Sequence, residues 1–411
     1  MKILYTNIGQ LLQVREGKKP LTGAAMNELP LINNAYLLTE NGIISDFGSM
    51  EDLPKNIKAD KTQNLEGKIM MPSWVDSHSH LVFAAARADE FVDKIQGLSY
   101  EEIAAKGGGI LNSAEKMNEI DEDTLYNQSA VLLKEVMKHG TGALEIKSGY
   151  GLSVEGELKM LRVIQRLKND FPISIKATFL GAHAIPKEYI NNKKAYIDLL
   201  INTLIPKIAK NHMADYIDVF CETNYFTPEE TERIITAGIK NGLKPKIHAN
   251  QFSSIGCIEK AVKHNAISVD HLEVMKDRDY EILQNSQTIA TVLPGCSFFI
   301  DIPYAPAKKM IEKGINVSLA TDFNPGSTPT FNMNFMVSLA CIKQKLSPQQ
   351  AINAATINAA NAMELQETMG SVSIGKKAVL SILKPFIKDF KEIPYYFGIN
   401  PIEEVILGDK N

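Results

Sequence analysis

The sequence predicts an α/β protein, namely a (β/α)₈ TIM barrel joined to a small β domain that is built from both chain ends. Eight strand-like apolar segments alternate with helical patterns over the middle of the 411 residues, which indicates a parallel sheet. Both ends have β character instead. No GxGxxG follows an early strand, which disfavours an open doubly wound sheet. We expect the β domain at 1–66 and 366–411, and the barrel at 67–365.

Both chain ends show short apolar runs without a helical period. KILYTNIG and AYLLTENGIISDFG lie in the first 66 residues, between Gly, Asn and Pro, and GSVSIGKKAVLSILKP at 370–385 has the same character. We therefore expect the two ends to pair into one small β domain.

The central segment supplies the eight expected barrel strands. In order they are IMMPSWVD (69–76), GALEI (142–146), ISIKATFL (173–180), YIDVFC (216–221), KPKIH (244–248), AISVD (266–270), TIATVL (288–293) and INVSLAT (315–321). Helical patterns separate them. In SVEGELKMLRVIQRLKND, Leu158, Leu161, Val163 and Ile164 form an apolar stripe behind a charged face that we expect to be exposed.

Composition excludes several classes of partner. Lys and Arg number 44 against 48 Asp and Glu, with no dense basic block, so nucleic acid is not expected. No apolar stretch reaches the ~18 residues of a bilayer span, and the first residues lack a signal-peptide pattern. Cys221, Cys257, Cys296 and Cys341 show no CxxC spacing. We therefore expect free thiols and a cytoplasmic protein without membrane contact.

The eight histidines divide into two groups by context. Three close helical patterns, where capping explains them: His139, His212 and His264. Five lie at or just after the carboxyl ends of predicted strands one, three, five and six: His78, His80, His183, His248 and His271. Asp322 follows strand eight. A single histidine of this kind is usually hydrogen-bonded packing, but these strand ends share one face of a barrel.

The convergence of these side chains predicts a metal site. An HxH pair with a distant His and Asp offers three nitrogens and one oxygen, which suit Zn²⁺ and also Fe²⁺. A strand ending in VDSHSH, a His on strand five, a His on strand six and an Asp on strand eight resemble the amidohydrolase superfamily. Its members hydrolyse amide-like bonds on a metallo-barrel flanked by a β-sandwich, so the resemblance implies that the β domain built from both chain ends is a small β-sandwich.

The resemblance implies one metal per chain, Zn²⁺ or Fe²⁺, with Fe³⁺ as a further oxidation state. The implied ligands are His78, His80, His248 and Asp322. Many superfamily members bridge a second metal with a carboxylated Lys or a Glu at the end of strand four, but this chain has Cys221 and Glu222 there. A single metal is therefore expected, and Lys147, at the end of strand two, is expected to be structural.

More specific segments resemble one group within the superfamily. They are FAAARADEF (83–91), EIKSGYGL (145–152), FLGAHAIP (179–186), IHANQ (247–251), SVDHLE (268–273), ATVLPG (290–295) and ATDFNPGS (320–327). That group hydrolyses a carbon–nitrogen bond of the cyclic amide 4-imidazolone-5-propanoate, giving N-formimidoyl-L-glutamate in histidine degradation. The resemblance thus implies a small anionic substrate and a homodimer. A related metal-dependent deaminase, another cyclic-amide hydrolase and a non-catalytic barrel scaffold are the alternatives.

The reaction needs a group that carries a proton from water to the leaving nitrogen. His271 is the first choice and Asp322 the second, while a hydrogen bond that holds Asp322 is the alternative role for His271. Gln251 stands where some relatives have Glu, and because an amide does not titrate it can only orient or polarise the substrate.

The substrate's propionate needs a cationic partner. Arg87, on the loop after strand one, offers two parallel hydrogen bonds, although by itself it would suit a surface pair with Asp89 or Glu90. Tyr150 lies in a Gly-Tyr-Gly turn and His183 follows Gly181, and we expect both to donate to the substrate.

The loop after strand eight is a further candidate for substrate contact. Its short side chains and backbone N–H groups come from Asn324, Gly326 and Ser327. Without the family resemblance, FNPGS is simply a good turn sequence.

Overall fold

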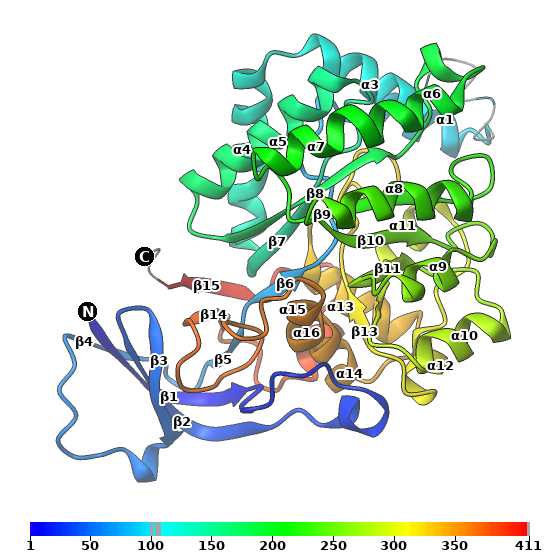
Figure 1. The fold of residues 1–411 in the computed structure, drawn as a ribbon. Coiled ribbons are helices and arrows are strands. Elements are labelled where there is room, and N and C mark those ends of the chain that lie inside the picture. Colours follow the sequence, from blue (N-terminus) through cyan, green and yellow to red (C-terminus); the bar gives the residue numbers. More distant parts are fainter. Residues whose placement is uncertain (99–101, 103–107, 409–411) are drawn as a thin grey trace.

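The computed structural model describes residues 1–98, 102 and 108–408 and places them in two sheets with surrounding helices (Figure 1). One sheet is mixed and contains seven strands, and the other is parallel and contains eight. Among the described helices, none is long and apolar enough to cross a membrane.

The mixed sheet joins the two ends of the chain, as predicted. Its strands are β1 (Lys2–Leu12), β2 (Leu31–Glu40), β3 (Ile43–Ser49), β4 (Lys61–Asn64), β5 (Ile69–Pro72), β14 (Val379–Leu383) and β15 (Ile402–Leu407), in the order β15-β14-β5-β1-β2-β3, with β4 paired to β1. The antiparallel pairing of β14 with β5 joins the carboxyl-terminal strands to the amino-terminal ones. Ile8, Leu11 and Leu37 are among the fully buried side chains of its core.

The parallel sheet is the predicted barrel. It contains β6 (Trp74–Asp76), β7 (Thr141–Lys147), β8 (Ser174–Ala182), β9 (Tyr216–Cys221), β10 (Lys244–Ala249), β11 (Ser268–His271), β12 (Ile289–Val292) and β13 (Val317–Leu319), each paired with the next. The first and last strands meet just beyond their ends. There Asp322 N–H donates to the His78 carbonyl at 2.9 Å, and His80 N–H to the Phe323 carbonyl at 2.8 Å.

The first predicted strand, 69–76, was wrong in one respect. It is two strands separated at Ser73, of which β5 joins the mixed sheet and β6 joins the barrel. A continuous apolar run does not show which sheet its residues pair with, because strands in both sheets are buried.

Helices surround the barrel and complete the chain. They are α1 (Ala88–Ile95), α3 (Gly109–Glu119), α4 (Glu122–Lys138), α5 (Val154–Asp170), α6 (Lys193–Leu199), α7 (Ile205–Lys210), α8 (Pro228–Lys240), α9 (Cys257–Lys263), α10 (Asp277–Gln284), α11 (Pro294–Ile300), α12 (Ala307–Glu312), α13 (Met333–Ile342), α14 (Pro348–Asn353), α15 (Ala359–Ala362) and α16 (Glu392–Tyr395). Shorter turns are η1 (Gly23–Asn27), η2 (Met50–Asp52), η3 (Lys187–Tyr189), η4 (Leu200–Leu204) and η5 (Ala354–Asn358).

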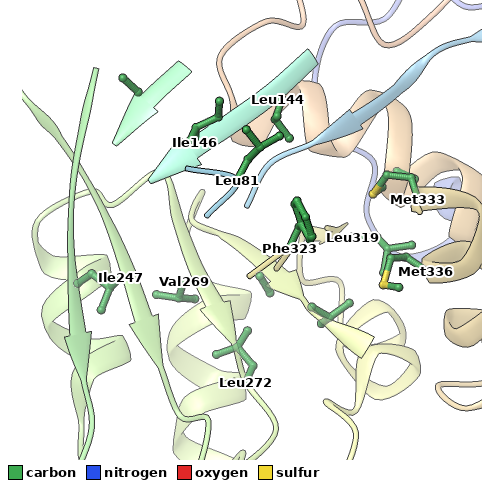
Figure 2. Packing of buried hydrophobic residues seen from close by; sticks show 14 of the residues in the cluster. Leu81, Leu144, Ile146, Ile247, Val269, Leu272, Leu319, Phe323, Met333 and Met336 are labelled. Atoms are coloured by element: carbon green, nitrogen blue, oxygen red, sulfur yellow. The ribbon is translucent and has the colours of Figure 1, made fainter. Parts of the chain in front are cut away.

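Apolar side chains between strands and helices hold the barrel together. Ile146, Ile247, Val269 and Leu319 come from four different strands and belong to one buried cluster (Figure 2). Each such side chain stabilises the fold by about 1.5–3 kcal/mol relative to leaving it in water. This packing fixes where each strand ends, and therefore where the side chains beyond it lie.

Two of the four cysteines are paired, contrary to the prediction of free thiols. Cys221 at the end of β9 forms a disulfide with Cys257 at the start of α9, and their Cα atoms are 6.1 Å apart. Cys296 and Cys341 are free. The pairing had no signal in the spacing, since 36 residues separate two positions that only the barrel brings together.

Candidate active site

Six predicted side chains meet at the carboxyl ends of the barrel strands. They are His78 and His80 after β6, His183 after β8, His248 on β10, His271 at the end of β11 and Asp322 after β13, and all are buried. His271 and Asp322 have φ values of 89° and 56°, in the left-handed region that few side chains adopt. Strained backbone of this kind is concentrated at functional sites.

Two histidines have their tautomer fixed by carboxylates behind them. His78 Nδ1–H donates to Asp270 Oδ2 at 2.6 Å, and His248 Nδ1–H donates to Asp218 Oδ2 at 2.9 Å. A neutral imidazole that donates from Nδ1 has a lone pair on Nε2. The Nε2 atom of His78 is buried and has no hydrogen-bond partner among the described residues.

The lone pairs converge on the Asp322 carboxylate without bonding to it. Asp322 Oδ1 lies 3.4 Å from His78 Nε2 and 3.5 Å from His80 Nε2, too far for good hydrogen bonds. The His78 and His248 ring centroids are 4.5 Å apart. Tetrahedral ligands about 2.1 Å from one ion lie roughly 3.4 Å from each other. The arrangement therefore fits a cation, which would satisfy acceptors that otherwise face one another in a buried space.

The charge states of these groups also suit metal binding. Burial, together with Lys147 and His248, lowers the pKa of His78 to about 4, and burial with the neighbouring imidazoles lowers that of His80 well below its usual value. Burial opposes ionisation of Asp322, but the surrounding histidines outweigh it and hold its pKa below the usual value. At neutral pH the cluster is thus two neutral imidazoles and a carboxylate, the protonation states that metals require.

A buried ion network lies beneath the cluster. Lys147 Nζ lies 2.8 Å from Asp218 Oδ2, 2.6 Å from Glu145 Oε1 and 3.5 Å from Asp270 Oδ2. Burial would lower the pKa of Lys147, but the three carboxylates raise it, so the side chain is charged. One ammonium group therefore holds both carboxylates that orient His78 and His248. The sequence predicted a structural Lys147 but missed Asp218 and Asp270.

We expect Lys147→Met to destabilise the protein by roughly 3–5 kcal/mol, because it leaves buried carboxylates without their cation. Metal affinity should fall by about 10–100-fold as the histidines lose their orientation. Urea unfolding and metal titration measure the two effects. Lys176→Met is the matched control, since Lys176 contacts Asp215 at the protein surface and should cost less than about 1 kcal/mol. Equal costs for the two variants would show that the buried network does not support the site.

Arg87 is not the surface ion pair that its sequence context allowed. Its side chain is 9% exposed, and its nearest carboxylate oxygen, on Glu90, is 3.9 Å away. Nε donates to Ser113 Oγ at 2.9 Å, whereas Nη2 is buried without a partner among the described residues. Gly326 permits this position, since a Cβ there would lie 2.4 Å from Nη1. The guanidinium thus joins the first and last strand loops and keeps free donors.

The turn that carries Tyr150 is held from behind by a glutamate. The Glu157 carboxylate accepts hydrogen bonds from the N–H groups of Gly149, Gly151 and Leu152 at 3.1, 2.8 and 3.0 Å. The charged face of α5 is therefore not wholly exposed as predicted, because Glu157 is fully buried. The apolar stripe of this helix is buried as expected. The guanidinium of Arg87 lies 5.7 Å from the Tyr150 ring centroid.

His183 has the opposite hydrogen-bonding character to that expected. Its Nδ1 lies 3.0 Å from the Gly149 carbonyl, which can only accept, so Nδ1 carries the proton. Burial and the nearby His248 lower the pKa of His183 to about 3. The ring is then neutral and has an acceptor at Nε2, so the predicted donation to substrate does not fit this tautomer.

The loop after β13 uses most of its polar atoms internally. Asn324 Oδ1 accepts from the N–H groups of Gly326 and Ser327 at 2.8 and 2.7 Å, and its Nδ2 donates to the Asp322 carbonyl at 2.7 Å. Ser327 Oγ donates to Asp322 Oδ2 at 3.2 Å. These contacts hold the Asp322 carboxylate and shape the loop against Arg87.

His271 lies among groups that can share a proton with it. Its Nδ1 is 3.5 Å from Glu273 Oε1. Burial alone would lower the pKa of His271, but Glu273 and Cys296 raise it well above its usual value. Gln251 Nε2 donates to Cys296 Sγ at 3.3 Å. Burial raises the pKa of the Cys296 thiol to about 11, so it is no nucleophile at neutral pH.

Glu222, at the end of the fourth barrel strand, has its oxygens engaged elsewhere. Its carboxylate accepts from the backbone N–H groups of Thr223, Phe252 and Ser253 at 2.8, 2.9 and 3.1 Å, and from the Ser253 hydroxyl. It supports the loop after β10 instead of pointing free lone pairs at the histidines, which favours a single resident metal.

Comparison with known proteins assigns this arrangement to a family. The amidohydrolase family model matches residues 69–410. The imidazolonepropionase of Flavobacterium johnsoniae is 58% identical over 408 residues, covering 99% of both chains, and that of Christiangramia forsetii is 55% identical over 411 residues and the full length of both. Among solved structures, E. coli guanine deaminase has a TM-score of 0.73 at 14% identity, covering 99% of this chain and 97% of its own. That likeness shows the fold alone.

Proposed function

Since this chain belongs to the amidohydrolase family, within its imidazolonepropionases, we propose that its barrel site opens 4-imidazolone-5-propanoate by hydrolysis of a ring carbon–nitrogen bond, giving N-formimidoyl-L-glutamate. The observation that carries the proposal is the pairing of a buried His/Asp metal cluster with an arginine whose Nη2 has no hydrogen-bond partner among the residues that the structure describes. The first suits activation of water, and the second suits the anionic tail of the substrate.

His78, His80, His248 and Asp322 would hold one cation, and their nitrogen and oxygen donors favour Zn²⁺ or iron. When bound, such an ion lowers the pKa of a water molecule towards about 7 and so supplies hydroxide at neutral pH. The carboxylates of Asp270 and Asp218 keep the His78 and His248 lone pairs directed at the ion. Metal analysis of the purified protein identifies the element.

His271 and Asp322 are the groups that would move the proton. The attacking water loses a proton and the ring nitrogen gains one as its bond to carbon breaks, so one group must accept a proton and one must donate one. Glu273 stabilises the protonated form of His271, which suits donation to the ring nitrogen, and the ionised carboxylate of Asp322 suits acceptance from water. Gln251 lies beside it and would orient the ring without titrating.

Arg87, Tyr150 and His183 would position the substrate. Arg87 would offer the propionate its Nη2, which has no partner within the described part of the chain, and Tyr150 lies beside the guanidinium. His183 presents an acceptor at Nε2, so we propose that it receives a ring N–H instead of donating. The loop of Asn324, Gly326 and Ser327 would close the site next to the guanidinium.

We expect Arg87→Ala to raise KM for the propanoate substrate roughly thirtyfold, the equivalent of about 2 kcal/mol of lost charge-assisted hydrogen bonding. The value of kcat should change less, because the tail is held equally in the ground state and the transition state. Steady-state kinetics measures both constants. Arg162→Ala is the control, since Arg162 pairs with Glu122 and Glu155 on the outer face of α5. An unchanged KM in Arg87→Ala would remove Arg87 from the site.

The direct test follows the ultraviolet absorbance of 4-imidazolone-5-propanoate with purified protein. The proposal expects loss of that absorbance, dependent on bound metal. Ammonia release from a nucleobase without imidazolone turnover would instead indicate a deaminase. A folded protein with no metal and no turnover would indicate a scaffold.

We further propose that the protein forms a homodimer, which the family resemblance supports, and that it works in the cytoplasm, which its place in histidine degradation supports although two of its cysteines are paired. Sedimentation equilibrium measures the oligomeric state, and fractionation of cells measures the compartment. A monomer at working concentrations would contradict the first statement.

A further inference from the structure

Cys296 lies beside the proposed reaction site but has no role in the reaction as described. It is fully buried in the first turn of α11, directly after β12. Its sulfur, one ring nitrogen of His271 and one oxygen of Asp322 all lie within 4.8 Å of one another. These three side chains come from three different strand ends, so the barrel itself brings them together.

Unpaired polar atoms border the same cluster. His271 Nδ1 and Glu273 Oε2 are buried and have no hydrogen-bond partner among the described residues. Leaving a buried donor or acceptor unsatisfied costs about 1–3 kcal/mol. A ligand that engages His271 would remove part of that cost, so the cluster is prepared for a bound group.

We propose that Cys296, His271 and Asp322 form a second cation site, specific for a thiophilic divalent ion such as Cd²⁺ or excess Zn²⁺. Sulfur, imidazole and carboxylate together are a softer donor set than the nitrogen and oxygen atoms of the resident site. Binding replaces the thiol proton of Cys296 by a metal–sulfur bond and one ring proton of His271 by a metal–nitrogen bond, and both protons pass to solvent.

Occupancy of this second site would inhibit the enzyme. Asp322 would be shared between two ions, and the bound ion would occupy the His271 ring nitrogen from which the reaction takes a proton. This consequence rests on the proposed function, whereas the binding itself does not. One ion in the resident site would thus activate the enzyme, and a further ion in the second site would inhibit it.

The experiment titrates the metal-loaded protein with Cd²⁺ and follows the ultraviolet charge-transfer band of a cadmium–thiolate bond. The resident site has no sulfur ligand, so exchange of its ion for Cd²⁺ produces no such band. Cys341→Ser leaves Cys296 as the single free thiol and should keep one band per chain. Cys296→Ser should abolish the band while Cys341 remains.

A band that persists in Cys296→Ser, or its absence from Cys341→Ser, would overturn the proposal. If Cys296→Ser does not fold, the presence or absence of the band in Cys341→Ser decides by itself. Activity is measured in parallel, and Cd²⁺ should inhibit the wild type and Cys341→Ser at the concentrations that develop the band. If the band develops but the untreated protein does not turn over imidazolone propanoate, the second cation site is supported and only the proposed function is contradicted.

Discussion

Asp322→Asn is expected to lower kcat by roughly 10²–10⁴-fold, the range for loss of a group that assists proton transfer. Metal affinity should fall as well, because a neutral amide replaces the only carboxylate in the proposed ligand set. Asparagine is the right replacement, since it adopts a φ of 56° as readily as aspartate does and has nearly the same shape. The change therefore removes charge while the backbone stays in place. Steady-state kinetics at saturating metal separates the loss of catalysis from the loss of the ion.

Asp301→Asn is the matched control for this substitution. Asp301 also has a left-handed backbone, with φ 57°, but it is exposed at the end of α11. It should leave kcat and metal content unchanged. Wild-type kcat in Asp322→Asn at saturating metal would show that the Asp322 carboxylate takes no part in the reaction.

The strands and the histidines at their ends were predictable because each depends on a local pattern. His78 and His80 follow an apolar run and lie two residues apart, so their side chains point to the same side of the strand. His248 and His271 end later apolar runs. The alternation of strands with helices predicts a barrel, which places all four histidines on one rim. The rim could be predicted without knowing any distance, because every parallel strand of a barrel ends on the same side.

The support beneath the site was harder to predict, although a signal existed. Lys147, Asp218 and Asp270 are charged residues within or at the end of buried barrel strands, in LEIK, YIDVF and SVDH. Strands of a parallel barrel are buried on both faces, so a charge within one must find a partner. Which charges pair depends on strand register, and that requires the three-dimensional structure. The Cys221–Cys257 pair likewise depends on the three-dimensional structure, which brings the end of β9 next to the start of α9.

Glu157 illustrates a different limit of sequence patterns. It is charged but stands four residues before Leu161, on the buried side of α5, whereas the charged residues of this helix were expected on its exposed face. Its carboxylate is buried because the turn of Tyr150 supplies three backbone donors. A charged residue type therefore predicts exposure wrongly where a neighbouring loop needs a buried hydrogen-bond acceptor for its backbone N–H groups.

His271→Asn is expected to lower kcat by roughly 10²–10⁴-fold while metal content and KM stay near wild type, because the imidazole would carry the proton and not hold the ion. Asparagine tolerates the left-handed backbone of this position, where φ is 89°, better than alanine does.

Glu273→Gln is the companion variant. It keeps the imidazole but removes the carboxylate 3.5 Å from Nδ1, so its kcat should fall less. Metal analysis of His271→Asn decides whether His271 carries the proton or binds the ion. The second role is open to it because one of its ring nitrogens lies within 4.8 Å of donor atoms of His78 and His248. Loss of the ion from His271→Asn would make His271 a ligand and leave Asp322 to move the proton.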